Sequence, residues 1–361
     1  MRWPSRHRFT PKKFNRAFRY SCCWAIIALL SFLIFNIQQQ IFFSQTTVSI
    51  PKSSEPLQLY SNQTDENLTT LYVQTIQSAK KSITFLIYAL TDKTIIKALK
   101  AKEEAGVAIH LVCDADATPS LAQHFPRSKV VRRKGTGLMH QKILVIDEML
   151  ILLGSANMTS DSLTKHGNLV IGLSHPPLAS LIASRAKEMR STGKIAPIEQ
   201  LQTSCADQPI ELYILPKNRN AEARVRSLLA TAKKTIRVAM FTWTRQDFTQ
   251  ELIHAAKRGV KVEAIVDRQS AKGTSAAIVK TLYEAGIAVK LSSSTTSLLH
   301  HKFAYIDESI LINGSANWTL SAFSRNDDCF MIIYDLNQSQ REKMGTLWNF
   351  LKKHSEFVKE N

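Results

Sequence analysis

His140–Asn157 has the sequence HQKILVIDEMLILLGSAN, and His300–Asn317 has the sequence HHKFAYIDESILINGSAN. Both copies contain His-x-Lys, four mostly apolar residues, an Asp, and then Gly-Ser-x-Asn at the same spacing. One copy alone would indicate no more than a strand with a polar entry. Two copies in one chain indicate two halves that each contribute the same set of groups to one site.

The periodicity of each copy separates its polar residues into two places. Lys142–Ile146 and Lys302–Ile306 are short and apolar and contain β-branched residues, which predicts buried strands. Side chains alternate between faces along a strand, so the His and the Lys of each copy share one face. The Asp of each copy has the opposite parity to the His. It follows the His by seven residues, which is about 23 Å along an extended strand at about 3.3 Å per residue. We therefore expect Asp147 and Asp307 to occupy turns between two strands.

The strand after each turn is expected to run back toward the His. Leu150–Leu153 and Ile310–Asn313 supply these returning strands. Their return brings the Gly-Ser-x-Asn segment close to the His end of the first strand. The predicted cluster takes four side chains from each half: His140, Lys142, Ser155 and Asn157 with His300, Lys302, Ser315 and Asn317.

This pattern resembles the signature of the phospholipase D superfamily, H-x-K-x4-D followed by G-S-x-N. The resemblance extends over about residues 56–335, and all eight core positions are intact. It implies an α/β fold of two duplicated, layered α/β/α halves, related by a pseudo-two-fold, with the active site at their interface. It also implies cleavage of a phosphodiester through a covalent phosphohistidine, with no metal and no other cofactor.

The residue types suit that chemistry. A phosphodiester is anionic, so its site needs cations or donors on the phosphoryl oxygens, a nucleophile, and an acid for the leaving oxygen. Lys142 and Lys302 supply charge, the Asn side chains supply donors, and the hydroxyls of Ser155 and Ser315 are expected to bind phosphate. Two His residues, with an unperturbed pKa of about 6.5, can divide the nucleophile and acid roles.

The two halves differ at the position 28 residues after each motif His, where the first half has Asn168 and the second has Asp328. Members of the family commonly have a carboxylate there that orients a catalytic His. If the pairing crosses between halves, Asp328 orients His140, which is then the nucleophile, and His300 is the acid. If the pairing stays within one half, the roles reverse. An ordinary turn carboxylate is the alternative for Asp328.

The repetition extends beyond the motifs, since residues 78–90 (SAKKSITFLIYAL) match residues 231–243 (TAKKTIRVAMFTW). A helix in each half is expected to end at a glycine, Gly106 or Gly259. Alternating helices and strands predict layered α/β halves. We divide the chain into a basic N-terminus with a signal anchor (1–43), a tether (44–57), a first half (58–175), a connector (176–208), a second half (209–335) and a C-terminal helix (336–361).

The N-terminus combines positive charge with an apolar run. Seven Lys or Arg residues and no acidic residue precede Tyr20, and Tyr20–Ile37 is uncharged and long enough for a short membrane anchor. No A-x-A cleavage site follows. We expect an uncleaved transmembrane signal anchor with the catalytic domain on the extracytoplasmic side. Secretion after cleavage is the alternative.

The composition favours an anionic partner. Lys and Arg number 47 and Asp and Glu 29, which gives +18, and an excess of 11 remains without the first 19 residues. The five Cys residues have no metal-ligand spacing and predict no disulfide framework.

The sequence leaves more than one substrate class open. We expect a phospholipid substrate because an anchor would hold the domain at a bilayer. A metal-independent nuclease acting on DNA or RNA is the alternative, and a catalytically dead, membrane-tethered binding module is a third class. Because both halves lie in one chain, we expect a monomer.

Overall fold

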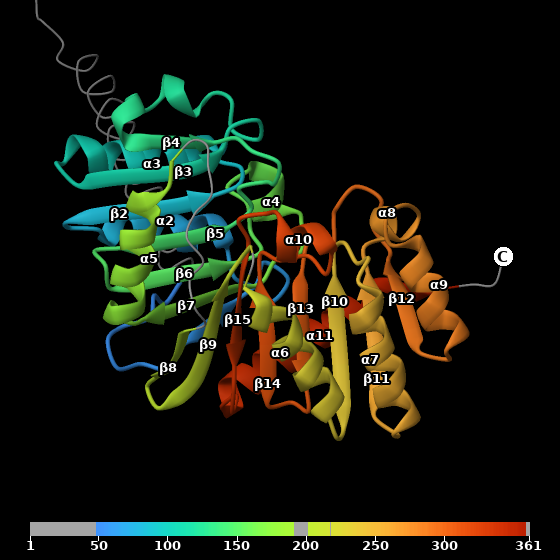
Figure 1. The fold of residues 1–361 in the computed structure, drawn as a ribbon. Coiled ribbons are helices and arrows are strands. Elements are labelled where there is room, and N and C mark those ends of the chain that lie inside the picture. Colours follow the sequence, from blue (N-terminus) through green and yellow to red (C-terminus); the bar gives the residue numbers. More distant parts are fainter. Residues whose placement is uncertain (1–47, 191–200, 217, 359–361) are drawn as a thin grey trace, which may run out of the picture. The chain divides into compact units, whose positions relative to one another are not determined.

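The computed structural model describes residues 48–190, 201–216 and 218–358 (Figure 1). The first half contains β1 (Gln58–Tyr60), α2 (Leu68–Ser78), β2 (Ser82–Ile87), α3 (Lys93–Glu104), β3 (Ala108–Asp114), the 3₁₀ turns η1 (Leu121–Gln123) and η2 (Arg127–Lys129), β4 (Val130–Arg133), β5 (Lys142–Ile146), β6 (Leu150–Gly154), α4 (Ser160–Thr164) and β7 (Val170–Ser174). Two further elements, α5 (Pro176–Glu188) and β8 (Leu201–Cys205), connect it to the second half.

The second half repeats this order with additions. It contains β9 (Gln208–Ile214), α6 (Arg219–Thr231), β10 (Thr235–Met240), α7 (Gln246–Lys257), β11 (Lys261–Val266), α8 (Arg268–Ala271), α9 (Ala276–Glu284), β12 (Ala288–Ser292), β13 (Lys302–Ile306), β14 (Ile310–Gly314), α10 (Leu320–Ser324), β15 (Cys329–Ile333), α11 (Gln338–Lys353) and β16 (Ser355–Phe357).

The two sheets share one strand order. The first has the order β1-β7-β6-β5-β2-β3-β4, and the second has β16-β12-β11-β10-β13-β14-β15-β9-β8. In each sheet three parallel strands, β2-β3-β4 or β10-β11-β12, adjoin an antiparallel meander, β5-β6-β7 or β13-β14-β15. The expected α/β class with duplicated halves is therefore confirmed.

Three hydrophobic cores separate the layers. One lies under α2 and α3, and another lies under α6, α7 and α9. A central core takes residues from both sheets together with α5 and α11. Along β13, Phe303 and Tyr305 belong to the central core while Ala304 and Ile306 belong to the outer one, as strand alternation requires. Figure 1 shows α6 and α7 on one face of the second sheet and α11 on the other. The shared core gives a site between the halves a closely packed base.

The structure differs from the expected extent of two segments, the tether and the C-terminal helix. Over residues 48–57 the expected tether packs against the first half: Leu57 is 2% exposed, and the Val48 N–H donates to Gln74 Oε1 at 3.2 Å. Ser, Thr and Pro dominate the composition of the segment, so the sequence alone did not indicate that its few apolar residues are buried. The expected C-terminal helix ends at Lys353, after which β16 pairs antiparallel with β12 because that strand offers free backbone partners at the sheet edge.

The expected signal anchor and the rest of residues 1–47 lie outside the described residues. Among the helices that the structure describes between residues 48 and 358, none has both the length and the apolar character of a membrane span.

The two motif aspartates occupy hairpin turns, as the parity of the strands predicts. Asp147 and Glu148 have φ of 53° and 54°, and Asp307 and Glu308 have φ of 51° and 55°. Positive φ at both central residues is typical of a two-residue hairpin turn. The carboxylate of Asp147 accepts the backbone N–H groups of Lys80, Lys81 and Ser82 at 2.7–2.8 Å. Asp307 does the same for residues 233–235. Each Asp therefore fastens a turn to the start of the neighbouring strand.

Asp147→Asn should lower the free energy of unfolding by about 1.5–3 kcal/mol, the value of hydrogen bonds to a charged acceptor, because the amide NH₂ cannot accept. Asn tolerates the positive φ, so the turn itself should survive. Urea denaturation measures the loss. Glu148→Gln is the matched control, since it removes only an exposed ion pair with Lys187. A stable, folded but inactive Asp147→Asn protein would contradict the structural role.

Candidate active site

The two motif histidines lie where the halves meet. The His140 N–H donates to the Asp327 carbonyl at 2.8 Å, and the Gly167 N–H donates to the Leu298 carbonyl, just before His300, at 2.9 Å. The residues before each motif thus pair with the segment after the short helix, α4 or α10, of the opposite half. Both imidazoles are buried, with 7% and 6% exposure.

Each imidazole is held at Nδ1 by a residue of the other half. His140 Nδ1 lies 2.8 Å from Asp328 Oδ1, and His300 Nδ1 lies 3.0 Å from Asn168 Oδ1. The structure thus has the cross-over arrangement rather than pairing within a half. A carboxylate or amide oxygen accepts from Nδ1–H, so the lone pair of each neutral ring lies on Nε2. Neither Nε2 makes a hydrogen bond within the described part of the chain.

The orientation of Asn168 is fixed by its own partners. Its Nδ2 donates to the carbonyl oxygens of Ser162 at 2.7 Å and His166 at 3.0 Å. Its Oδ1 is therefore the atom that faces His300. The equivalent of His166 in the second half is Asn326, and both accept the backbone N–H of the leucine two residues before a motif His, at 3.1 Å.

The hydroxyls of the two motif serines, which we expected to bind phosphate, both donate to partners within the protein. Ser155 Oγ donates to Asn168 at 2.9 Å, and Ser315 Oγ donates to Asp328 at 2.6 Å. Both residues are fully buried. They position the partners of the histidines instead. Gly154 permits this close approach, because a Cβ there would lie 2.3 Å from the Leu169 carbonyl oxygen.

The two motif lysines are buried and point back toward their own histidines. Lys142 Nζ donates to the His140 carbonyl at 2.6 Å, and Lys302 Nζ donates to the His300 carbonyl at 2.8 Å. Burial lowers the pKa of Lys142 to about 7, although Asp328 opposes this shift. Burial lowers the pKa of Lys302 well below its usual value, and the neighbouring Lys142 adds to that effect. Within this cluster both ammonium groups lack a carboxylate partner at ion-pair distance.

The two histidines are in unequal electrostatic surroundings. Burial lowers the pKa of His140, while Asp328 raises it and Lys142 lowers it. Burial lowers the pKa of His300 well below its usual value, and Lys302 and Lys142 lower it further. Because Asn168 carries no charge, only His140 has a carboxylate that stabilises its imidazolium form. Burial raises the pKa of Asp328, but the neighbouring His140 outweighs this effect, so the pKa of Asp328 lies below its usual value.

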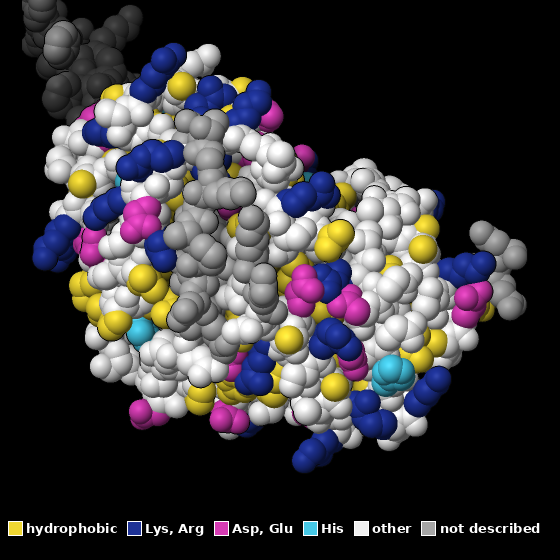
Figure 2. Space-filling view, viewed as in Figure 1, with side chains coloured by type: hydrophobic (Ala, Val, Ile, Leu, Met, Phe, Trp, Pro, Cys, Tyr) yellow, Lys and Arg dark blue, Asp and Glu magenta, His cyan; other side chains and the backbone are white. Residues whose placement is uncertain are grey.

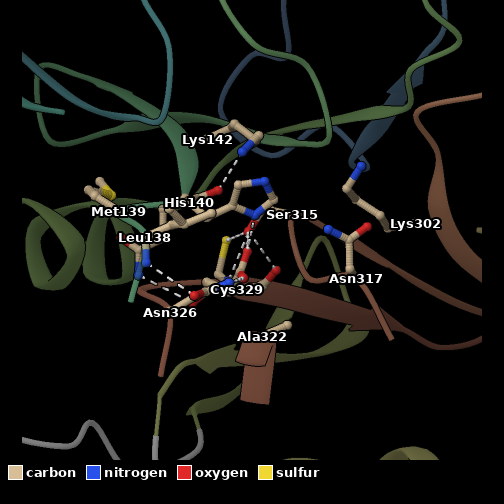
Figure 3. A network of polar contacts seen from close by, with 12 residues as sticks. Leu138, Met139, His140, Lys142, Lys302, Ser315, Asn317, Ala322, Asn326 and Cys329 are labelled. Atoms are coloured by element: carbon tan, nitrogen blue, oxygen red, sulfur yellow. Dashed lines mark hydrogen bonds and ion pairs between the residues drawn. The ribbon is translucent and has the colours of Figure 1, made fainter. Parts of the chain in front are cut away.

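The two motif asparagines complete the cluster. Asn317 Oδ1 accepts the Thr242 N–H at 3.3 Å, which leaves its NH₂ for other partners. In Figure 3 the side chains of Lys302 and Asn317 extend toward the His140 ring, and Lys302 acts on the pKa of that ring. Asn157 Oδ1 is buried and has no partner among the described residues. Both asparagines thus retain hydrogen-bonding capacity for a bound group.

Two aromatic residues of the site were not identified from the sequence. The Tyr88 ring lies 5.2 Å from the His140 ring and 5.1 Å from Lys142 Nζ. The Phe241 ring lies 5.0 Å from the His300 ring and 4.8 Å from Lys302 Nζ. The repeat that aligns residues 78–90 with residues 231–243 places these two residues at matching positions, and that was the available signal. Among the described residues, no group of three His, Cys, Asp or Glu is arranged to hold a metal ion.

The duplicated sheets and the paired His-x-Lys sites define a two-domain protein of the phospholipase D superfamily. A family model described as "Cardiolipin synthase, PLD-like domain" matches residues 72–190 and 225–348, one stretch in each half. The chain belongs to this family.

Individual relatives match over part of their length. A mitochondrial cardiolipin hydrolase of Chlamydomonas reinhardtii is 33% identical over 132 residues, which cover 36% of this chain and 58% of the relative. The probable cardiolipin synthase YwiE of Bacillus subtilis (strain 168) is 28% identical over 159 residues, 41% of this chain and 32% of that protein. The crystal structure of phosphatidylserine synthase from Haemophilus influenzae Rd KW20 has a TM-score of 0.67 at 14% identity, over 86% of this chain and 89% of that one, which shows a shared fold.

Replacing Asn168 by Asp, together with His166→Asn, would reproduce the Asn326–Asp328 pair of the second half around His300. The added carboxylate should raise the pKa of His300 by about 1 unit or more, because an opposite charge at hydrogen-bond distance stabilises the imidazolium. NMR titration of the imidazole measures this directly. His166→Asn alone is the control and should leave the His300 pKa low. An unchanged His300 pKa in the double variant would contradict the assignment of the charge asymmetry to position 168.

Proposed function

We propose that this protein is a phospholipase D-type phosphodiesterase that acts on phospholipids of the cardiolipin class, by hydrolysis or by transfer to an alcohol. The observation that carries the proposal is the pair of buried imidazoles, each held at Nδ1 by the opposite half with Nε2 left for chemistry. The names of the relatives, cardiolipin hydrolase and cardiolipin synthase, support the lipid class.

The charge asymmetry between the two histidines supports the following first step. His140 Nε2 attacks the phosphorus, and the bond from phosphorus to the leaving oxygen breaks. The imidazole becomes cationic as it forms the phosphohistidine, and Asp328 at Nδ1 stabilises that charge. His300 acts in its imidazolium form, which the negative charge of the bound phosphodiester favours. Because His300 has no carboxylate partner, this imidazolium is the stronger acid and gives its Nε2 proton to the leaving oxygen.

The lysines and asparagines act on the phosphoryl oxygens. Burial lowers the pKa values of Lys142 and Lys302, so the empty site carries less positive charge than its composition suggests. The negative charge of a bound phosphodiester reverses this effect and favours both ammonium forms. Together with the amides of Asn157 and Asn317, these groups stabilise the charge that develops on the oxygens in the transition state.

The second step returns the enzyme to its starting state. Neutral His300 takes a proton from water or an alcohol, whose oxygen attacks the phosphorus and breaks its bond to His140 Nε2. With water, cardiolipin yields phosphatidic acid and phosphatidylglycerol. With an alcohol the phosphatidyl group is transferred, so hydrolase and synthase activities differ only in the acceptor. We further propose that the basic, apolar N-terminus of residues 1–43 holds the domain at a membrane.

His140→Asn and His300→Asn should each lower turnover on the order of 10³-fold or more, because each removes one half of a coupled acid and nucleophile. The assay compares vesicles containing labelled cardiolipin with a single-stranded oligonucleotide, each in the presence of ethanol. We expect phosphatidylethanol at the expense of phosphatidic acid. His254→Asn is the control, since this residue is exposed on α7 and its ring lies 3.9 Å from Glu251, outside the candidate site.

Two results would count against the proposal. Retention of more than a few per cent of activity by either motif variant would overturn the roles of the two histidines. Oligonucleotide cleavage that depends on His140, in the absence of any lipid product, would favour the nuclease.

A further inference from the structure

Two exposed leucines adjoin the site on one side. Leu138 is 43% exposed and lies two residues before His140, while Leu320 is 63% exposed and lies three residues after Asn317. Single exposed apolar residues are ordinary on protein surfaces. These two differ because they occur together at the edge of a buried polar cluster.

The leucines belong to one continuous edge, although they come from different halves. The Leu138 N–H donates to Asn326 Oδ1 at 3.1 Å, a contact drawn in Figure 3, and the Asp327 N–H donates to the Leu138 carbonyl at 2.8 Å. Gly137 lies against the backbone of Arg325, where a Cβ would be 2.0 Å from the carbonyl oxygen. We call this edge, Lys134–Met139 with Leu320–Arg325, the leucine lip.

Positive side chains flank the leucine lip. The Lys134 side chain is 72% exposed, and its acidic neighbour Asp116 is 81% exposed at the loose distance of 3.8 Å. Arg325 is exposed and donates to the neutral hydroxyl of Ser321. In Figure 2, a hydrophobic side chain lies at the position of α10, with Lys or Arg side chains and also Asp or Glu side chains nearby. Apolar tips among cations match an anionic bilayer surface.

The equivalent edge of the second motif is built differently. Ser292–Leu299 (SSSTTSLL) replaces Arg132–Met139 (RRKGTGLM), and its exposed residues are Ser or Thr. Ser160 takes the position of Leu320. The fold therefore accepts a polar residue at the position of Leu320. The position of Leu138 is also a leucine in the second half, Leu298, but that residue is only partly exposed.

We propose that the leucine lip docks the protein on an anionic lipid bilayer, with Leu138 and Leu320 inserted below the headgroups and Lys134 and Arg325 against lipid phosphates. This inference rests on the proposed function, and it explains how a headgroup phosphodiester reaches His140 while the acyl chains stay in the membrane. A nucleic acid would use the cations, but it offers no apolar layer for the leucines. The chemistry therefore favours a lipid surface.

The first test places a reporter on the lip of the full chain. Leu138→Trp and Leu320→Trp are mixed with vesicles of acyl-brominated phosphatidylcholine, with and without phosphatidylglycerol, and compared with the parent chain. Met149→Trp is the matched control: Met149 is 47% exposed and lies in the turn at the opposite end of β5. We expect additional quenching for both lip variants and none for the control, and the effect should weaken with salt. Equal quenching in all three variants, or none, would overturn the docking surface, as would shielding of the lip by an oligonucleotide but not by vesicles.

The second test separates docking from chemistry. Leu138→Ser with Leu320→Ser should lower the rate on bilayers about tenfold, through lost apolar insertion, and leave the rate on a monomeric short-chain phospholipid unchanged. An equal loss on both substrates would overturn the docking role. Quenching of the lip reporters without any lipid turnover would leave the docking surface standing and refute the proposed function.

Discussion

The bond between His140 Nδ1 and Asp328 is the contact on which the geometry of the site depends. It crosses from one half to the other, so His140, the proposed nucleophile, is aligned only when both halves are folded and packed together. The central core makes that packing possible, because it takes residues from both sheets at once. Ser315 then holds the carboxylate in place from within its own half. Alignment of the site is in this sense a property of the interface rather than of either half.

The same interface creates an electrostatic problem. Two lysines and two histidines are buried together, and Asp328 is the carboxylate in hydrogen-bonding contact with this group. Burial lowers the pKa of each of the four cationic groups, so the site reduces its charge by releasing protons. In the proposed reaction, a phosphodiester supplies the missing negative charge. Recognition and activation are thereby linked, because the anion that binds is also the group that restores the charged lysines.

The sequence predicted the part of this arrangement that follows from repetition and parity. Two identical motifs indicated two halves, and opposite strand parity placed Asp147 in a turn away from His140, as observed. The hydroxyls of Ser155 and Ser315 could not be assigned in the same way, because spacing shows that they are near the histidines but not which atom takes their proton. Leu57 and β16 were missed for a related reason: their structure depends on distant partners, the central core and the free edge of β12.

A duplicated fold also has a chemical limitation that this chain overcomes by small differences. Two histidines in identical surroundings would have identical pKa values and could not easily divide the roles of nucleophile and acid. Asn168 stands where the second half has Asp328, and it breaks that equivalence because it carries no charge. The halves also differ around the two histidines. Tyr88 lies beside His140 where Phe241 lies beside His300, and the leucine lip has exposed leucines where the exposed residues of Ser292–Leu299 are Ser or Thr. The symmetry of the fold thus assembles the site, and the differences between the halves make the surroundings of the two histidines unequal, as the proposed division of roles requires.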